Sequence, residues 1–183
     1  MFRHQLQHVI LEIGRRFGLR EFHIIGSAAI LAAMPDPPVG ALTATRDVDV
    51  IPPGSDDKLA DRISFVLGEA SDFDAEYGYY AQGVSAATPE YAPREWMSRA
   101  LPIRVGDYTA WCMEPTDLVL SKLDAGRERE KDFDFARSAA TLQLVTEAGL
   151  LERLGLVTAT PAMRELIAGR IHALFRKPPR PLA

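Results

Sequence analysis

The sequence predicts an α/β fold of the α+β kind, in which a small mixed sheet is flanked by helices and followed by a helical C-terminal portion. Three observations predict it. Short apolar runs rich in strand-forming residues occur before residue 114. Segments with helical apolar spacing precede and separate these runs. After residue 114 the patterned segments are helical, so we expect those helices to pack on the sheet.

The composition fits one soluble domain. The chain has 183 residues, of which 47% are hydrophobic and 25% are charged. At roughly 150 residues per domain, this length favours a single domain over residues 1–183. We expect an α/β core over about residues 1–113 and a helical extension packed on it over about residues 114–183, with no internal repeat.

The charge balance argues against some classes of partner. Lys and Arg total 21 against 25 Asp and Glu, giving a net charge of −4, so we expect no DNA partner, although a local basic groove is left open. The longest apolar run, residues 24–34, is interrupted by Gly26 and Ser27 and is shorter than the roughly 20 residues that span a bilayer. We predict no membrane contact and no signal peptide, and hence a cytoplasmic protein. Cys112 has no second cysteine to pair with and is expected to be buried.

The first predicted elements are a helix, a strand and a second helix. Residues 2–17 form an amphipathic helix that ends near Gly18. Residues 22–25 are strand formers, Gly26 allows a tight turn, and residues 27–34 favour a helix. The apolar stripe of the first helix consists of Phe2, Leu6, Val9, Ile10, Ile13 and Phe17.

A loop, a second strand and a third helix follow. The Pro-rich residues 35–40 cannot continue a helix, and residues 45–51 then alternate polar and apolar side chains as a strand does. Ser55 is expected to cap a helix that extends to Leu67. Residues 71–94 mix aromatic, glycine and small polar residues and predict no regular element.

The remaining predicted elements are a β-hairpin and four helices. Strands over residues 101–105 and 108–113 flank a turn at Gly106-Asp107. Pro115 opens a helix at its first position. Three further helices are predicted over residues 132–142, 145–154 and 161–175.

The segment TRDVDV at residues 45–50 contains the most informative pattern. Because strand side chains alternate between faces, Asp47 and Asp49 project together, about 6–7 Å apart. Val48 and Val50 then point into the core. Two carboxylates on one face suit Mg²⁺, which prefers oxygen ligands and is used in pairs by phosphoryl-transfer and nucleotidyl-transfer enzymes. The alternative is a half-exposed strand whose aspartates are only solvated, although Asp is a poor strand former.

Gly26 and Ser27 lie at the junction between the first strand and the following helix. Backbone N–H groups at a helix N-terminus, together with the Ser27 hydroxyl, form an anion-binding corner that suits a triphosphate. In the simpler interpretation, Gly26 supplies a turn and Ser27 an N-cap, and both interpretations can hold together.

The order of strand, Gly26-Ser27, helix, loop and a strand with Asp47-x-Asp49 resembles the nucleotidyltransferase superfamily, which includes DNA polymerase β and the aminoglycoside nucleotidyltransferases. The Pro-rich loop lengthens the interval between the two motifs, as it does in relatives of the AbiEii-type and MenT-type toxins. The resemblance implies a minimal nucleotidyltransferase core with a polymerase-β-like fold.

A second motif lies in residues 114–132. EPTDL followed by SKLDAGREREKD looks like the Lys-Leu-x-Ala-Gly-Arg and Lys-Asp segment of uncharacterised bacterial nucleotidyltransferase-like proteins, and the joint resemblance covers roughly residues 20–140. It implies that Lys122 contacts nucleotide phosphates and that Asp132 is the later acidic member of the site. Arg127 is a candidate for a bidentate phosphate contact. The alternative for both basic residues is a solvated helix face.

The superfamily usually supplies a third carboxylate from a strand, and neither predicted hairpin strand contains one. Asp107 falls in the turn. Asp132 is preferred through the resemblance, and the other candidates are Asp134, Asp74 and Glu76. A missing third ligand would imply weak metal binding or a non-catalytic domain.

The resemblance implies a Mg²⁺-dependent nucleotidyltransferase, with Mn²⁺ as the alternative cation, that transfers NMP from an NTP to an acceptor hydroxyl. It suggests tRNA or a protein as acceptor and an antitoxin protein as partner, while a small-molecule acceptor stays open. The alternatives are a catalytically degenerate nucleotide-binding or protein-interaction domain of the same fold, and a structural subunit with incidental aspartates. The expected site residues are Asp47 and Asp49 for metal binding and catalysis, Asp132 for catalysis, and Gly26, Ser27, Lys122 and Arg127 for nucleotide binding.

Overall fold

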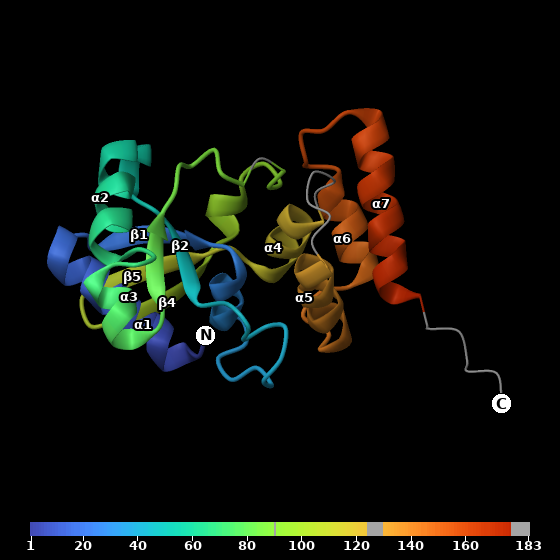
Figure 1. The fold of residues 1–183 in the computed structure, drawn as a ribbon. Helices are drawn as coiled ribbons and strands as arrows, with labels where there is room; N and C mark the ends of the chain where they lie inside the picture. The colour runs from blue at the N-terminus through green and yellow to red at the C-terminus, as the bar shows by residue number, and fades with distance from the viewer. Residues whose placement is uncertain (90, 124–129, 177–183) are drawn as a thin grey trace.

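A five-stranded sheet with the strand order β3-β2-β1-β5-β4 lies beside the group of helices α4 to α7 (Figure 1). The computed structural model describes residues 1–89, 91–123 and 130–176. β1 runs antiparallel to β2 and parallel to β5, while β3 is parallel to β2 and β4 antiparallel to β5. The mixed sheet is therefore as predicted. Its strands are β1 (Glu21–Ile25), β2 (Asp47–Ile51), β3 (Tyr80–Gly83), β4 (Leu101–Val105) and β5 (Tyr108–Cys112).

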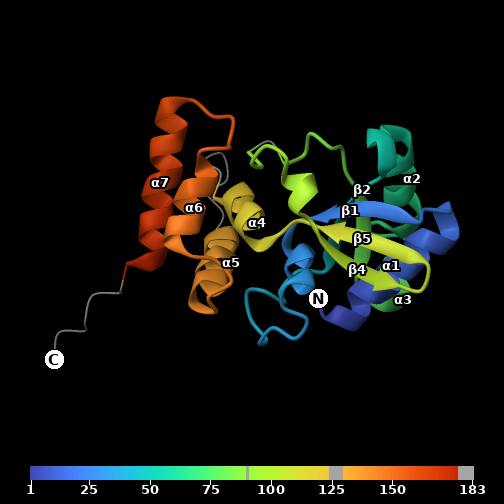
Figure 2. The same cartoon turned by 180° about the vertical axis from the view of Figure 1, so that it is seen from behind.

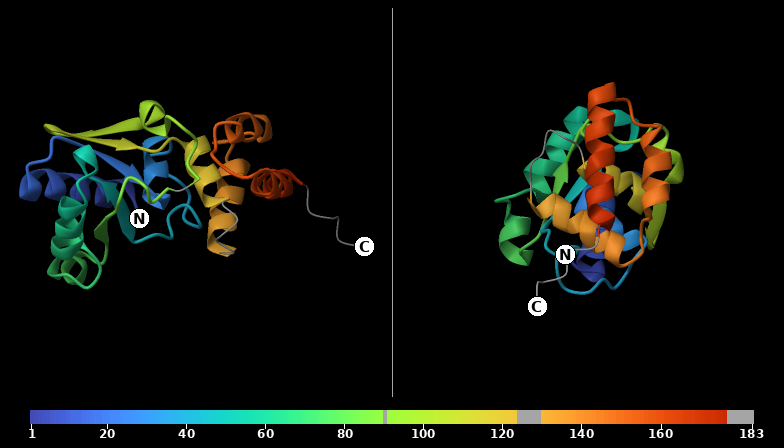
Figure 3. Two further views of the ribbon diagram at one scale, coloured as in Figure 1. Left: turned by 90° about the horizontal axis from the view of Figure 1, so that it is seen from above. Right: turned by 90° about the vertical axis from the view of Figure 1, so that its right-hand side faces the viewer.

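Helices cover the sheet and extend from one end of it. α1 packs against β4 and β5, and α2 packs against β3. α4 contacts the short 3-10 helix η1 that follows β1, α5 and α6 pack on α4, and α7 packs on α5 and α6 (Figures 2 and 3). The helices are α1 (Arg3–Phe17), η1 (Ser27–Ala32), η2 (Pro53–Ser55), α2 (Asp57–Leu67), α3 (Asp72–Tyr77), η3 (Trp96–Arg99), α4 (Pro115–Lys122), α5 (Glu130–Thr141), α6 (Glu147–Leu154) and α7 (Pro161–Phe175).

Apolar side chains at alternate positions of β1 and β2 are buried in the core beneath the sheet. Phe22 and Ile24 of β1 and Val48 and Val50 of β2 are buried, and burying each such side chain contributes about 1.5–3 kcal/mol. Asp47 and Asp49, which alternate with these valines along β2, are only partly buried. The period of two therefore turns the polar positions of β2 away from the core, as predicted.

The predicted helix over residues 27–34 and the predicted cap at Ser55 are wrong in detail. The first segment is the six-residue 3-10 helix η1, and Pro35, which cannot continue a helix, follows three residues after its end. Ser55 has a φ of 54° and lies in η2, whereas the Asp56 side chain caps α2 by accepting a hydrogen bond from the Leu59 N–H (3.1 Å).

Two elements, α3 and β3, lie in the stretch for which the sequence predicts no pattern. Ser71 caps α3 through its hydroxyl, and Gly78 ends the helix with a φ of 73°. β3 then pairs with β2 and places Tyr80 opposite Asp47. The predicted hairpin is confirmed as β4 and β5, and the four predicted C-terminal helices are confirmed as α4 to α7. Within the described ranges, no helix has both the length and the apolar character that crossing a bilayer requires.

Candidate functional site

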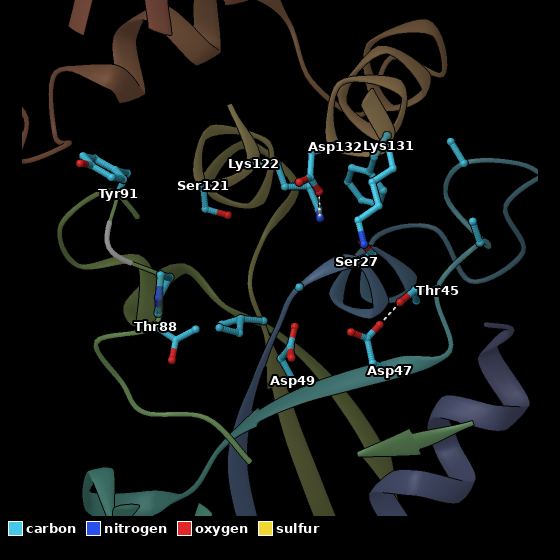
Figure 4. A pocket seen from close by; sticks show the side chains of 16 residues that line it. Ser27, Thr45, Asp47, Asp49, Thr88, Tyr91, Ser121, Lys122, Lys131 and Asp132 are labelled. Carbon is cyan, nitrogen blue, oxygen red and sulfur yellow. Dashed lines mark hydrogen bonds and ion pairs between the residues drawn. The ribbon is translucent and has the colours of Figure 1, made fainter. Parts of the chain in front are cut away.

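A polar pocket of about 310 Å³ lies between the sheet and the C-terminal helices (Figure 4). Four parts of the chain form its walls: the end of β1 with the start of η1, the first half of β2 with the loop before it, the end of α4 with the start of α5, and the loop after β3. The pocket brings together six of the seven residues predicted for the site. These are Gly26, Ser27, Asp47, Asp49, Lys122 and Asp132.

Asp47 and Asp49 form the sheet side of the pocket. They project from β2 on the same face (Figure 4), and the register with β1 places Asp49 opposite Ile25. Asp47 accepts a hydrogen bond from the Thr45 hydroxyl. The Thr45 carbonyl oxygen in turn accepts a hydrogen bond from the Met1 amino group (2.7 Å), and burial lowers the pKa of that amino group while the charge of Asp47 opposes the shift. The loop before Asp47 is thus anchored to Met1, and the predicted strand over residues 45–51 begins only at Asp47.

Gly26 allows the chain to turn directly against Asp49. Its φ of 70° and ψ of −175° are accessible to glycine and costly for other residues. A Cβ atom at this position would collide with the Asp49 carboxylate. Ser27 follows at the start of η1 and lines the pocket. Because η1 is a short 3-10 helix, the Ser27 hydroxyl, rather than a helix dipole, is a group at this corner suited to an anion.

Lys122 and Asp132 form the helical side of the pocket. The Lys122 ammonium lies 2.9 Å from the Asp132 carboxylate and 4.9 Å from the centroid of the Phe135 ring. The two charged side chains are 13% and 8% exposed. α4 supplies the lysine and α5 supplies its two neighbours. The pair therefore presents a fixed cation toward the space that separates the helices from the sheet.

The pocket wall includes residues that the sequence did not single out. Ser121 precedes Lys122, and Lys131 precedes Asp132 at the exposed start of α5. Thr88 and Tyr91 come from the loop after β3. The helical period could have placed Lys131 beside Phe135, four residues on, but no local pattern indicates that the loop would approach the site.

The other candidates for a third carboxylate lie outside this pocket. Asp74, on α3, pairs with Arg46 (2.6 Å). Neither Glu76 nor the exposed Asp134 lines the pocket. Arg127 lies outside the described residues. Among the residues that the structure describes, no three His, Cys, Asp or Glu side chains are grouped as a metal site.

A second charged cluster lies between η3, α4 and α6. Asp117 is fully buried and accepts hydrogen bonds from Arg99 (2.9 and 3.1 Å) and Arg153 (2.7 Å). Glu114 caps α4 and also pairs with Arg153 (2.8 Å). Asp117 and Glu114 belong to the EPTDL motif. Their ion pairs with arginines of η3 and α6 could not be predicted from the spacing of the motif.

Asp47 and Asp49 fit a divalent cation by their chemistry. Their carboxylate oxygens are the donors that Mg²⁺ prefers, they share one face of a strand, and they open into a pocket that contains further hydroxyl groups. Since Mg²⁺ keeps several water ligands and takes others from substrate phosphates, two protein carboxylates are an adequate protein contribution.

One protein family has a sequence model that matches residues 5–162 of the chain. The family is described as a nucleotidyltransferase of unknown function (DUF6036). The matched range contains all of the pocket residues named above. No curated protein and no solved structure matches the chain.

Proposed function

Since the chain belongs to the DUF6036 family of nucleotidyltransferases, we propose that it transfers NMP from an NTP to an acceptor hydroxyl with the help of Mg²⁺ or Mn²⁺. The observation that carries the proposal is the placement of Asp47 and Asp49 in one pocket with Lys122 on the facing wall. Such a pocket combines donors for cations with a cation for phosphate oxygens, and a metal-bound triphosphate needs both.

The carboxylates would hold the cation, and the other residues would hold the nucleotide. Asp47 and Asp49 would be the protein ligands. A bound divalent cation would neutralise charge on the triphosphate and help activate the acceptor hydroxyl. Ser27 offers a hydroxyl to a phosphate oxygen beside them, and Lys122 offers an ammonium from the opposite wall.

Positioning would then supply much of the catalysis. The acceptor oxygen forms a bond to the α-phosphorus while the bond from that phosphorus to the bridging oxygen breaks. Pyrophosphate leaves, and the hydroxyl proton passes to solvent. Gly26 matters here because its missing side chain lets the phosphate-binding turn approach Asp49. A pocket that fixes the triphosphate relative to the acceptor lowers the entropic part of the barrier.

Transfer of labelled NMP tests this proposal. The protein is incubated with each α-labelled NTP and Mg²⁺, with total tRNA, a protein extract or a small-molecule mixture as acceptor, and both label transfer and pyrophosphate release are measured. Asp49→Asn should lower the rate at least about a hundredfold, because metal-based charge stabilisation is worth several kcal/mol. Asp61→Asn, an exposed change on α2, is the matched control. Transfer that survives Asp49→Asn would remove the carboxylate pair from the reaction.

The same experiment separates a second candidate function, nucleotide binding without transfer. It is favoured by the ion pair between Lys122 and Asp132, because Asp132 is the carboxylate that the resemblance suggests as the third acidic residue of the site. Metal-dependent NTP binding with no pyrophosphate release for any acceptor would support it. Label found in RNA would support a tRNA acceptor and a toxin-like role, and label found in protein would support a protein acceptor.

A further inference from the structure

Lys122 is held at the pocket by two residues on one face of α5. Asp132 and Phe135 are three residues apart, so both point from the helix in nearly the same direction. The lysine ammonium contacts the carboxylate of the first (2.9 Å) and the ring face of the second (4.9 Å to the centroid). α5 therefore provides a two-point support for a side chain that belongs to α4.

Burial makes this support necessary. Lys122 is 13% exposed and Asp132 is 8% exposed, and an ammonium at such depth is costly unless a counter-charge compensates for lost hydration. A lysine also has four rotatable bonds, and fixing them costs up to about 2 kcal/mol of side-chain entropy. A carboxylate and a ring that fix the ammonium before the ligand arrives remove that cost from the binding step.

We propose that Asp132 is a positioning residue, which with Phe135 holds the Lys122 ammonium ready for nucleotide phosphates, rather than a ligand of the metal. This inference rests on the function proposed above. An ammonium has three N–H donors, and the carboxylate takes one of them. The opposite side of the ammonium is directed to the pocket, where Figure 4 shows Asp47 and Asp49 on the far wall.

Electrostatics separates the two roles of Asp132. A carboxylate that already neutralises a lysine at 2.9 Å attracts a second cation weakly, and the lysine itself repels that cation. The same lysine attracts a triphosphate. Asp132 should therefore affect anion binding through Lys122, and it should leave the gain from added metal unchanged.

Calorimetric titration with inorganic tripolyphosphate tests the proposal, in EDTA and in Mg²⁺. In EDTA, introducing Lys122→Ala into the parent protein should raise the Kd for tripolyphosphate about tenfold, since a hydrogen bond to a charged group is worth about 1.5 kcal/mol or more. In the Asp132→Ala protein, adding Lys122→Ala should raise this Kd less than about twofold. Asp132→Asn keeps an oxygen acceptor in place, so Lys122→Ala should still weaken the Kd about threefold there. The exposed Asp134→Ala is the matched control on the same helix.

The gain in affinity on adding Mg²⁺ distinguishes the alternatives. We expect Asp132→Ala and Asp132→Asn to keep this gain, whereas Asp49→Asn loses it. The proposal is overturned if Asp132→Asn loses the gain as Asp49→Asn does, or if Lys122→Ala remains fully effective without the carboxylate. It is also overturned if the parent protein binds no tripolyphosphate in EDTA. The nucleotide transfer proposed above is judged separately, by label transfer.

A second variant keeps the test decisive if Asp132→Ala does not fold. Phe135→Leu retains the ion pair and removes the ring, so it should reduce the effect of Lys122→Ala to a value between those of the parent and of Asp132→Ala. An unchanged effect in Phe135→Leu would exclude the ring from the support. Thermal unfolding followed by circular dichroism confirms that each compared variant is folded.

Discussion

Two clusters of the molecule each contain a buried aspartate paired with basic side chains, and they differ in whether the basic side chain borders a pocket. In the cluster between η3, α4 and α6, Asp117 is surrounded by Arg99 and Arg153 and lies outside the pocket. In the pocket wall, Asp132 pairs with Lys122. Both aspartates are buried. The difference is that the arginine cluster pairs its charges with one another, whereas Lys122 faces a space that a ligand can enter.

This difference teaches how to read a buried ion pair. Where each charge is matched within the protein, removal of a partner leaves an uncompensated charge and costs stability. Where a matched cation also borders a pocket, its remaining donors are available to an anion. Variants of the arginine cluster should therefore change the free energy of unfolding, and variants of the pocket should change ligand affinity.

The largest effect is expected from Asp117→Asn. The amide removes the counter-charge of Arg99 and one of the two counter-charges of Arg153, which keeps Glu114, so the free energy of unfolding should fall by about 3–5 kcal/mol. Urea denaturation measures it, with the exposed Asp61→Asn expected to stay within about 0.5 kcal/mol of the parent. At a temperature where the variant is folded, its NTP affinity should be that of the parent. Lost affinity in the folded variant would break the distinction between the two clusters.

Gly26→Ala should produce the next largest effect, and it acts on the pocket. The new methyl group collides with the Asp49 carboxylate, so Mg²⁺-dependent NTP binding should weaken about tenfold, in addition to a backbone cost of about 1–3 kcal/mol. Gly54→Ala is the matched control, because Gly54 has a similar φ of 68° and nothing near its would-be Cβ. Equal losses of NTP affinity in the two variants would show that Gly26 acts through backbone strain alone.

Cys112 offers a chemical probe of the region beside the arginine cluster. It is fully buried in β5, two residues before Glu114, and burial raises the pKa of its thiol to about 12. The native protein should therefore react with a disulfide reagent at pH 8 only through opening of the fold. Asp117→Asn should speed this reaction and Lys122→Ala should not. Fast labelling of the parent protein at pH 8 would contradict the buried position.

The smallest expected effect is a pH dependence from His23. Burial lowers its pKa below the ordinary value of 6.5, although Glu21 opposes the shift, and its ring contacts Trp96 at the start of η3. The unfolded chain then binds the proton more readily than the folded protein does. His23 therefore leaves stability unaffected above about pH 6.5 and reduces it as the pH falls below that value. His23→Gln should flatten this acid slope in urea denaturation, and the exposed His4→Gln should not.

The sheet side of the site could be predicted from sequence, because its chemistry is local. Asp47 and Asp49 share a strand face by the period of two, and Gly26 marks the turn before η1. The helical side depends on contacts between distant parts of the chain. The expectation that Lys122 contacts phosphates rests on a resemblance, and nothing in the spacing indicates that Asp132 pairs with it. The buried partners of Asp117 come from three elements, which no local period can bring together.

The fold shows the same limit. α1, which has a clear apolar stripe, and α7, which begins at Pro161 behind the Thr160 cap, could be located from the sequence within one or two residues. The short edge strand β3 could not, because four residues give too little alternation to recognise. Its position beside β2 is set by pairing with a strand already in the sheet.

The central claim is that Asp47 and Asp49 form a metal-dependent nucleotide site. Calorimetric titration of each NTP into the purified protein, in Mg²⁺ and then in EDTA, tests it most directly, with the Asp47→Asn/Asp49→Asn protein alongside. We predict binding of at least one NTP that requires both the metal and the two carboxylates. Metal-independent binding that is the same in the double variant would contradict the claim, as would the failure of every NTP to bind the parent protein.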